Sequence, residues 1–293
     1  MENSTMKDSN RVVLAVMAAI ALLMGLYLVL IAPGFMGSTM DKLILAKTKQ
    51  ATVFAAGPLS RLYVGAIYSG FEITAGLALI AISYAIFRGR KWSWPLAMLL
   101  LAIPAAANAY IGLGWIENLK QFPPAYITFF LSLAAFWAML FLKKNDGKTK
   151  VAMFFVFTLL GMIASQAFIF FPHALRVIMK SPGAAILDPT VSILRQAGPL
   201  MFITVFLALA AVWLLAKRKR SGWYVALVSG LTIAVASFPV HYLRPTASLV
   251  PSETLEPSIF TSAYWMAGAQ GVILIILLLI PFFKNQLVDK AEE

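Results

Sequence analysis

Eight apolar stretches, each long enough to cross a lipid bilayer, alternate with polar connections along the chain. They cover residues 12–32, 62–87, 94–113, 124–142, 151–171, 198–216, 223–240 and 265–283. About 20 apolar residues in a helix span the hydrocarbon core. In lipid every backbone polar group must bond within the protein, and the strict alternation of a membrane β-strand does not occur here. The pattern therefore predicts an all-α, polytopic membrane bundle of about eight helices.

The connections are of two kinds. Every second one is short and strongly basic, at residues 88–91, 143–150 and 217–220. The others are longer and less basic for their length, and the long ones among them are residues 33–61, 172–197 and 241–264. Because short basic loops stay in the cytoplasm, the pattern predicts a multi-pass protein of the cell (inner) membrane. Both the N- and the C-terminus are then cytoplasmic.

Two further features refine this topology. The long outer connections carry amphipathic stretches, such as residues 43–45 and 177–179, which we expect to lie along the outer interface as short helices. Tryptophans lie near the ends of the predicted spans, as an aromatic belt at the membrane surface would have them. These tryptophans are Trp92, Trp94, Trp115, Trp223 and Trp265.

The two halves of the chain share a pattern. Residues 11–33 and 150–172 align without a gap, each with a basic start, an apolar run of equal length and a final proline. The first and third basic turns are each followed by a tryptophan, Trp94 and Trp223. Four spans per half keep both halves in the same orientation, so the pattern predicts a parallel tandem repeat. The predicted four-helix membrane units are residues 1–146 and 147–293.

In the first unit, Arg61 opens a Gly- and Ala-rich span that continues through residues 71–79 and closes on the basic, Trp-containing turn at 88–94. This third of the chain resembles small four-helix membrane proteins of the DoxX-like type. The resemblance implies a four-helix unit and, for some members of that group, work beside quinone-linked oxidoreductases. The chain has no family-defining motif, so the resemblance assigns no functional residue.

Composition supports a membrane protein and excludes several classes of site. The chain is 61% hydrophobic and 12% charged, against about half and about a quarter in soluble domains. The net charge of +12 does not indicate nucleic acid as a partner, because the basic residues flank apolar spans. The chain has no cysteine, which excludes disulfides, thiolate metal sites, iron–sulfur clusters and c-type haem attachment.

Glu72 is the ionisable residue that lies deepest in a predicted span, about 16 Å along the helix from Arg61. A carboxylate there is costly, which favours a role in proton relay or cation pairing. The alternative is a protonated acid that is hydrogen-bonded to a neighbouring helix. Uncharged polar residues in the outer halves of other spans predict a polar pocket open to the outside, although each can instead form an interhelical hydrogen bond. They are Asn108, Tyr110, Ser165, Gln166 and Gln270.

The histidines of the chain are His173 and His241. Each follows a proline closely at the outer end of a span, and the two spans run in the same direction. This placement suits a pair of ligands to haem b, with Arg176 and Arg244 near the propionates. The alternative is an interfacial histidine that bonds to backbone or water. Two histidines alone do not make a zinc site, so no metal site is predicted.

No catalytic motif occurs in the sequence. We therefore expect a membrane protein without catalytic chemistry of its own, which binds a lipid, a quinone, a partner membrane protein or a second copy through the outer pocket. It can serve as a non-catalytic subunit of an oxidoreductase complex. Two alternatives stay open: a b-type cytochrome or quinone-reactive subunit that uses both histidines, and a proton-coupled transporter that uses Glu72.

Overall fold

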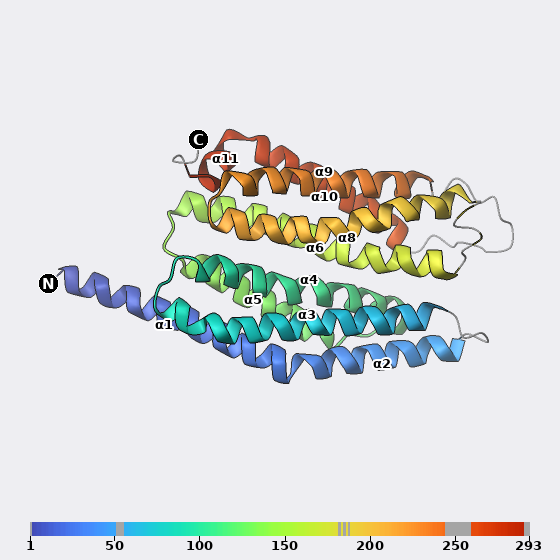
Figure 1. The fold of residues 1–293 in the computed structure, drawn as a ribbon, viewed down its shortest axis with the longest axis horizontal. Helices are drawn as coiled ribbons and strands as arrows, with labels where there is room; N and C mark the ends of the chain where they lie inside the picture. The colour runs from blue at the N-terminus through green and yellow to red at the C-terminus, as the bar shows by residue number, and fades with distance from the viewer. Residues whose placement is uncertain are drawn as a thin grey trace.

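The computed structural model describes residues 2–50, 56–180, 183, 186, 188–243 and 259–289. This part of the chain is almost entirely helical and contains no strand (Figure 1). Its helices are α1 (Glu2–Leu30), α2 (Ala32–Gln50), α3 (Ala56–Phe87), α4 (Ser93–Leu119), α5 (Ala125–Leu142), α6 (Gly147–Lys180), α8 (Pro189–Ala216), α9 (Arg220–Leu243), α10 (Ile259–Leu279) and α11 (Pro281–Leu287). Seven of the predicted spans each fall on one of these helices, and the span at 265–283 runs from α10 into α11, which confirms the all-α bundle.

The length and composition of these helices suit a bilayer. The described residues contain six candidate membrane spans, or seven if α10 and α11, which meet at 80°, are counted as one. Helix α4 adds an apolar stretch of fully described residues at Ser93–Ala109. Large hydrophobic side chains point outward from the bundle, for example Leu23 at 65% exposure and Leu231 at 56%. An exposed apolar surface of this kind belongs in lipid, so the chain is a multi-pass membrane protein.

The helices form two bundles that lie side by side (Figure 1). In the first bundle α1 packs on α3, α3 on α4, α4 on α5, and α5 returns to α1. In the second bundle α6, α8, α9 and α10 contact one another in the same cyclic order. Contacts of α4 with α6 and α8, and of α3 with α6, join the two bundles.

Glycines allow the closest helix crossings within each bundle. A Cβ atom on Gly76 of α3 would lie 2.9 Å from the carbonyl oxygen of Gly25 on α1. A Cβ atom on Gly230 of α9 would lie 2.8 Å from the carbonyl oxygen of Gly271 on α10. Neither crossing has room for a side chain, so the backbones pack directly against each other, as small residues permit in membrane helices.

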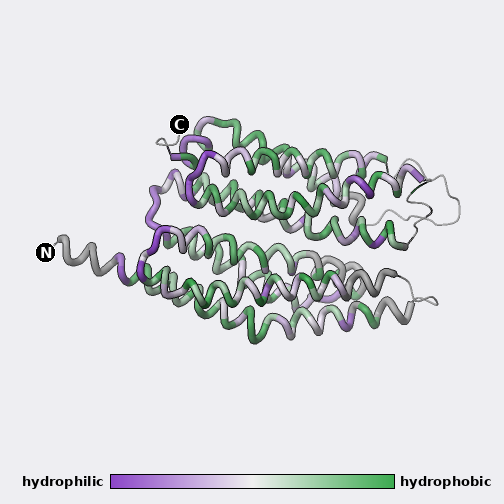
Figure 2. The backbone as a smooth tube through the Cα atoms, in the orientation of Figure 1, coloured by the Kyte–Doolittle hydropathy of each residue, from purple (hydrophilic) through white to green (hydrophobic). Residues whose placement is uncertain are grey.

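The three short basic connections lie at one end of the molecule, on the left in Figure 1, where Figure 2 shows hydrophilic turns. The first and third of these turns have the same backbone geometry. Gly89 and Arg218 both adopt positive φ, at 68° and 56°. The next residue of each turn donates its N–H to the helix before it over 3.0 Å, from Arg90 to Ala85 and from Lys219 to Leu214.

The tryptophans after these turns make matching contacts. Trp94 donates its Nε1–H to the carbonyl of Met139, and Trp223 donates its Nε1–H to the carbonyl of Leu278, each over 3.0 Å. Both carbonyls lie in the last turn of a helix, where they lack helical donors. Lys143 and Lys284 lie 5.3 Å and 5.8 Å from the centres of the two indole rings. The same arrangement of tryptophan, carbonyl and lysine therefore occurs at the basic end of both bundles.

The outer connections differ from the prediction of short interfacial helices. Residues 43–45 belong to α2, which continues α1 past a bend at Ile31 and packs on α3, α4 and α5 (Figure 1). Residues 177–179 lie in the last turns of α6, which continues through Pro172. Both segments continue long helices, so they lengthen the bundle instead of forming separate short helices, and Leu45 and Met179 are exposed. Most of the third connection, 244–258, lies outside the described residues.

The tryptophans only partly fit the predicted aromatic belt. Trp92 and Trp265 are half exposed, as a belt at the membrane surface requires. Trp94 and Trp115 are buried, so the prediction is wrong for these two. Their rings fill space between helices and lie next to the ammonium groups of Lys143 and Lys42.

Candidate functional site

An apolar groove of about 300 Å³ lies where the two bundles meet. Four helices line it: α4 and α5 from the first bundle, and α6 and α8 from the second. The space exists because the facing positions are small. The small residues are Ala102, Ala105, Ala106 and Ala109 on α4 and Gly161 and Ser165 on α6. A Cβ atom on Gly161 would meet nothing within 4 Å.

Aromatic side chains form much of the remaining wall of the groove, namely Phe129, Phe136, Trp137 and Phe157. The polar side chains that line it, Thr158, Ser165 and Gln166, come from α6. Ser165 donates to the carbonyl of Gly161 over 2.8 Å. The hydroxyl oxygen of Thr158 and Oε1 of Gln166 are buried and have no hydrogen-bond partner in the described part of the chain. A polar atom left in this state costs about 1–3 kcal/mol, so both favour a hydrogen-bonding ligand.

Glu72 lies in the core of the first bundle, away from this groove. Its side chain on α3 is fully buried, and Asn108 on α4 donates Nδ2–H to its Oε1. Asn108 also donates to the carbonyl of Pro104 over 2.9 Å. The second oxygen of Glu72 and Oδ1 of Asn108 are buried without partners among the described residues. These are the two atoms that a protonated Glu72 would join, by donating from Oε2 to Oδ1.

All four long helices of the first bundle contribute polar groups around Glu72. The hydroxyl groups of Tyr27 on α1 and Thr128 on α5 are 2.9 Å apart, and Tyr27 is near enough to interact electrostatically with Glu72. No cation pairs with Glu72 among the described residues. The ion pair found there joins Arg218 and Asp289, at the basic end of the second bundle. A buried carboxyl without a cation is most stable as the neutral acid. The cluster can therefore hold a proton at Glu72.

A hydrogen bond from Tyr68 ties the two bundles together beside the groove. Proline at 172 has no N–H, so the carbonyl of Phe168 in α6 loses its helical donor. The hydroxyl of Tyr68 on α3 donates to that carbonyl over 2.8 Å. The Tyr68 and Phe168 rings also meet edge to face, with centroids 4.6 Å apart. The proline in one bundle thus creates the acceptor for a side chain of the other.

The two histidines lie in different surroundings. His173 is buried on α6, with Nδ1 3.5 Å from Arg176 and its ring 6.1 Å from that of Tyr264 on α10. His241 is half-buried in the last turn of α9, next to Tyr242. Neither histidine lines the groove. Arg244 lies outside the described residues, so haem binding stays a prediction. Within the described residues, no three His, Asp or Glu side chains group as a metal site.

The polar residues predicted to share one outer pocket are found in separate places. Asn108 pairs with Glu72, while Ser165 and Gln166 line the groove between the bundles. Gln270 is buried on α10, and its Oε1 has no partner in the described part of the chain. The side chain of Tyr110 lies outside the described residues.

Two residues of this region were not predicted from the sequence. Thr158 is hidden as one hydroxyl in an apolar run, and no sequence signal distinguishes it. Tyr68 could have been anticipated in part, because Pro172 requires an outside donor for the carbonyl four residues earlier.

Comparisons of the chain with family models, with curated proteins and with solved structures found no match. The groove between the bundles, the Glu72–Asn108 pair and the basic end are therefore the features from which a function can be inferred.

Proposed function

We propose that the protein binds a lipid-soluble ring compound of the quinone type in the groove between its two bundles. In this proposal it is a membrane binding protein or complex subunit without catalytic chemistry of its own. The observation that carries the proposal is the pair of unpartnered polar atoms, on Thr158 and Gln166, in a groove that is otherwise apolar and aromatic.

The shape of the groove supports a ring with an apolar tail. The side chains of Phe129, Phe136, Trp137 and Phe157 offer flat faces and edges against which a ring can stack. The volume of about 300 Å³ lies at the lower end for small-molecule sites, and the wall leaves few polar contacts, as such sites usually do. A long tail can leave the groove toward the lipid.

The polar groups suit both redox states of a quinone. The Gln166 carboxamide has a donor end and an acceptor end, and the Thr158 hydroxyl can both donate and accept. An oxidised ring offers two carbonyl acceptors, while a reduced ring also offers hydroxyl donors. Thr158 and Gln166 are eight positions apart on α6, or about 12 Å along the helix axis. One of these two residues can therefore bond to the ring of the ligand, while the other lies beside a ring substituent or the tail.

The binding experiment uses quenching of tryptophan fluorescence, since Trp137 lines the groove and quinones quench indole emission. The probe is a short-chain benzoquinone, titrated into purified protein in detergent. Gly161→Leu fills the groove where a side chain has room, and we expect it to weaken binding at least tenfold. Gln166→Leu should weaken binding about tenfold, for one lost hydrogen bond.

The matched control is Gly70→Leu, which also adds a side chain to open space but lies on the exposed face of α3. It should bind the quinone as the parent chain does. Equal affinity in the Gly161→Leu and Gly70→Leu proteins would refute the groove as the binding site.

We also infer that the two bundles are copies of one four-helix unit. The matching turns, the matching tryptophan contacts and the shared cyclic order of helices support this. The asymmetry lies in the chemistry: Glu72 and Asn108 belong to the first bundle, and the equivalent part of α8 is apolar.

For the topology we propose the inner membrane, with the basic end in the cytoplasm. The three basic turns at one end of the molecule support this placement. Cysteine labelling tests it, because the natural chain has no cysteine. A cysteine introduced at Gly147 should react with an impermeant maleimide only after the cells are opened.

A further inference from the structure

A second cavity, of about 270 Å³, lies at the basic end of the first bundle. It is lined where α1, the turn between α3 and α4, and the turn between α5 and α6 come together. One part of its wall is apolar, formed by Val13, Leu14, Met17 and Ile86. Another part is cationic, formed by Arg90, Lys143 and Lys144.

Among the described residues that line this cavity there are three cations and no carboxylate. Lys143 is the most enclosed of the three: its ammonium group lies 5.3 Å from the centre of the Trp94 ring, and burial lowers its pKa. The nearest acid along the chain, Asp146, is used elsewhere, because its carboxylate accepts hydrogen bonds from the N–H and hydroxyl of Thr149. Clustered positive charge of this kind favours an anion from outside the chain.

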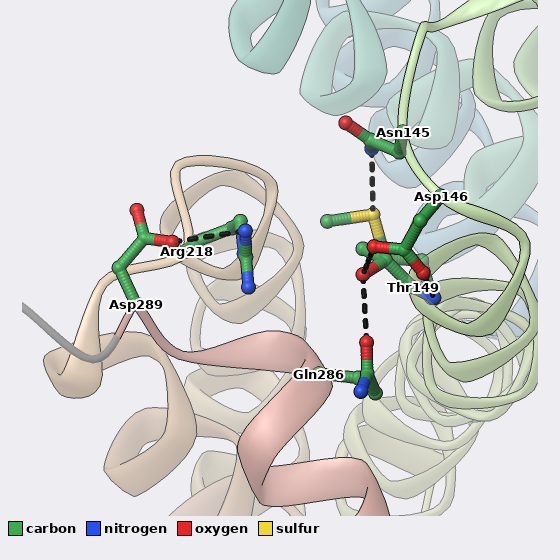
Figure 3. Close-up of polar contacts among 7 residues, drawn as sticks. Asn145, Asp146, Thr149, Arg218, Gln286 and Asp289 are labelled. Atoms are coloured by element: carbon green, nitrogen blue, oxygen red, sulfur yellow. Dashed lines mark hydrogen bonds and ion pairs between the residues drawn. The ribbon is translucent and has the colours of Figure 1, made fainter.

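The second bundle shows how the chain itself places an anion at the equivalent turn. After α10 the chain bends by 80° into α11 and returns to the turn between α8 and α9. There the carboxylate of Asp289 pairs with Arg218 over 2.9 Å (Figure 3). The N–H of Asp289 also donates to the Arg218 carbonyl. Gln286 on α11 bonds to Thr149 and holds this segment against α6.

The first bundle has no such segment at its own turn. Beyond α5 the chain passes directly into α6 through residues 143–146, and no helix folds back as α11 does in the second bundle. The turn at Gly89, which matches the turn at Arg218, therefore opens into the cavity instead of meeting a carboxylate.

We propose that this cavity binds the phosphate group of an anionic phospholipid. Arg90, Lys143 and Lys144 contact the phosphate. The phosphate is then the anion at this turn, as the Asp289 carboxylate is the anion that pairs with Arg218 in the second bundle. An acyl chain lies against the apolar wall of the cavity, along the face of α1 that carries Val13, Leu14 and Met17. Basic pockets between membrane helices bind anionic head groups in this way. The apolar half of the wall favours a lipid over free phosphate.

The test measures lipid retention by native mass spectrometry of the full-length protein, with phosphatidylglycerol and phosphatidylcholine offered in equal amounts. We expect the protein to retain phosphatidylglycerol about tenfold or more over phosphatidylcholine. The double variant Arg90→Gln/Lys144→Gln should lose this preference. The control Lys148→Gln/Lys219→Gln removes the same charge from the same end, and Lys219 is the counterpart of Arg90 in the second bundle, so this variant should keep the preference.

Two results would overturn the proposal. One is an equal loss of preference in both double variants, which would mean that net charge and not the cavity attracts the lipid. The other is displacement of phosphatidylglycerol by millimolar inorganic phosphate, which would assign the cavity to a soluble anion. The single variant Lys144→Gln changes only an exposed side chain, so it should fold normally and provides the test if the double variant does not fold. Quinone binding in the groove is measured separately and does not depend on the outcome.

Discussion

Replacing Tyr68 with phenylalanine removes one oxygen atom from the contact between the two bundles. The phenylalanine ring can keep the edge-to-face contact with Phe168, at 4.6 Å between centroids. What is lost is the hydrogen bond of 2.8 Å to the Phe168 carbonyl. That carbonyl is buried and lacks a helical donor, because Pro172 has no N–H.

The expected cost follows from this geometry. A typical hydrogen bond contributes about 0.5–1.5 kcal/mol, and in membrane proteins measured interhelical bonds average about 0.6 kcal/mol. A buried carbonyl left without any donor costs more, about 1–3 kcal/mol. We therefore expect Tyr68→Phe to lower the free energy of unfolding by about 1–1.5 kcal/mol.

Pro172→Ala provides the decisive comparison. Alanine at 172 restores an N–H that can donate to the Phe168 carbonyl, so the carbonyl no longer depends on Tyr68. In that background Tyr68→Phe should cost less than about 0.5 kcal/mol, which gives a coupling near 1 kcal/mol in the double-mutant cycle.

The assay is equilibrium unfolding in mixed micelles, by titration with dodecyl sulfate and far-ultraviolet circular dichroism. Tyr63→Phe is the control, because Tyr63 lies on the same helix at 67% exposure, and it should leave the unfolding free energy unchanged. A cost that is the same with proline and with alanine at 172 would refute the role given to the proline.

Three further predictions can be checked with the same assay. Gly271→Leu places a side chain against the backbone of Gly230 and should destabilise the protein by at least about 1–3 kcal/mol, whereas Gly70→Leu should have little effect. Glu72→Gln keeps a donor and an acceptor for its partner and should be tolerated, but Glu72→Ala leaves buried polar atoms unpaired and should lower the unfolding midpoint. Hydrogen bonds from Thr149 lower the pKa of Asp146 below the ordinary value of about 3.8, so its stabilisation of the α6 N-terminus is present above that pH. This stabilisation should be lost as the pH falls further, and the Asp146→Ala protein should lack this pH dependence. The test is the unfolding free energy of both proteins measured as a function of pH.

Much of the candidate site lies beyond the reach of sequence patterns. The sequence predicts Glu72 as a deeply buried acid, because one charge in a long apolar run is conspicuous, and the structure buries it fully. It does not predict the pairing with Asn108, since the depth of a residue along a helix says nothing about the direction of its side chain. For the same reason the sequence predicts Gln166 and Gln270 in one pocket, whereas Gln166 lines the groove and Gln270 is buried elsewhere on α10.

The sequence misses α2, whose residues fall in a predicted connection, but it predicts the eight helices that carry the apolar spans and the basic end of the molecule, because these depend on local length, hydropathy and charge. It also indicated matching halves, through the shared turns before Trp94 and Trp223. Which helix faces pack together, where the groove opens and which polar groups meet become visible only in the folded structure. The physical reason is that lipid is as apolar as the protein interior, so hydropathy does not distinguish the face toward lipid from the face toward a neighbouring helix. That choice depends on small residues such as Gly76 and Gly271, which let two helix backbones come into contact, and such contacts exist only once the helices are packed.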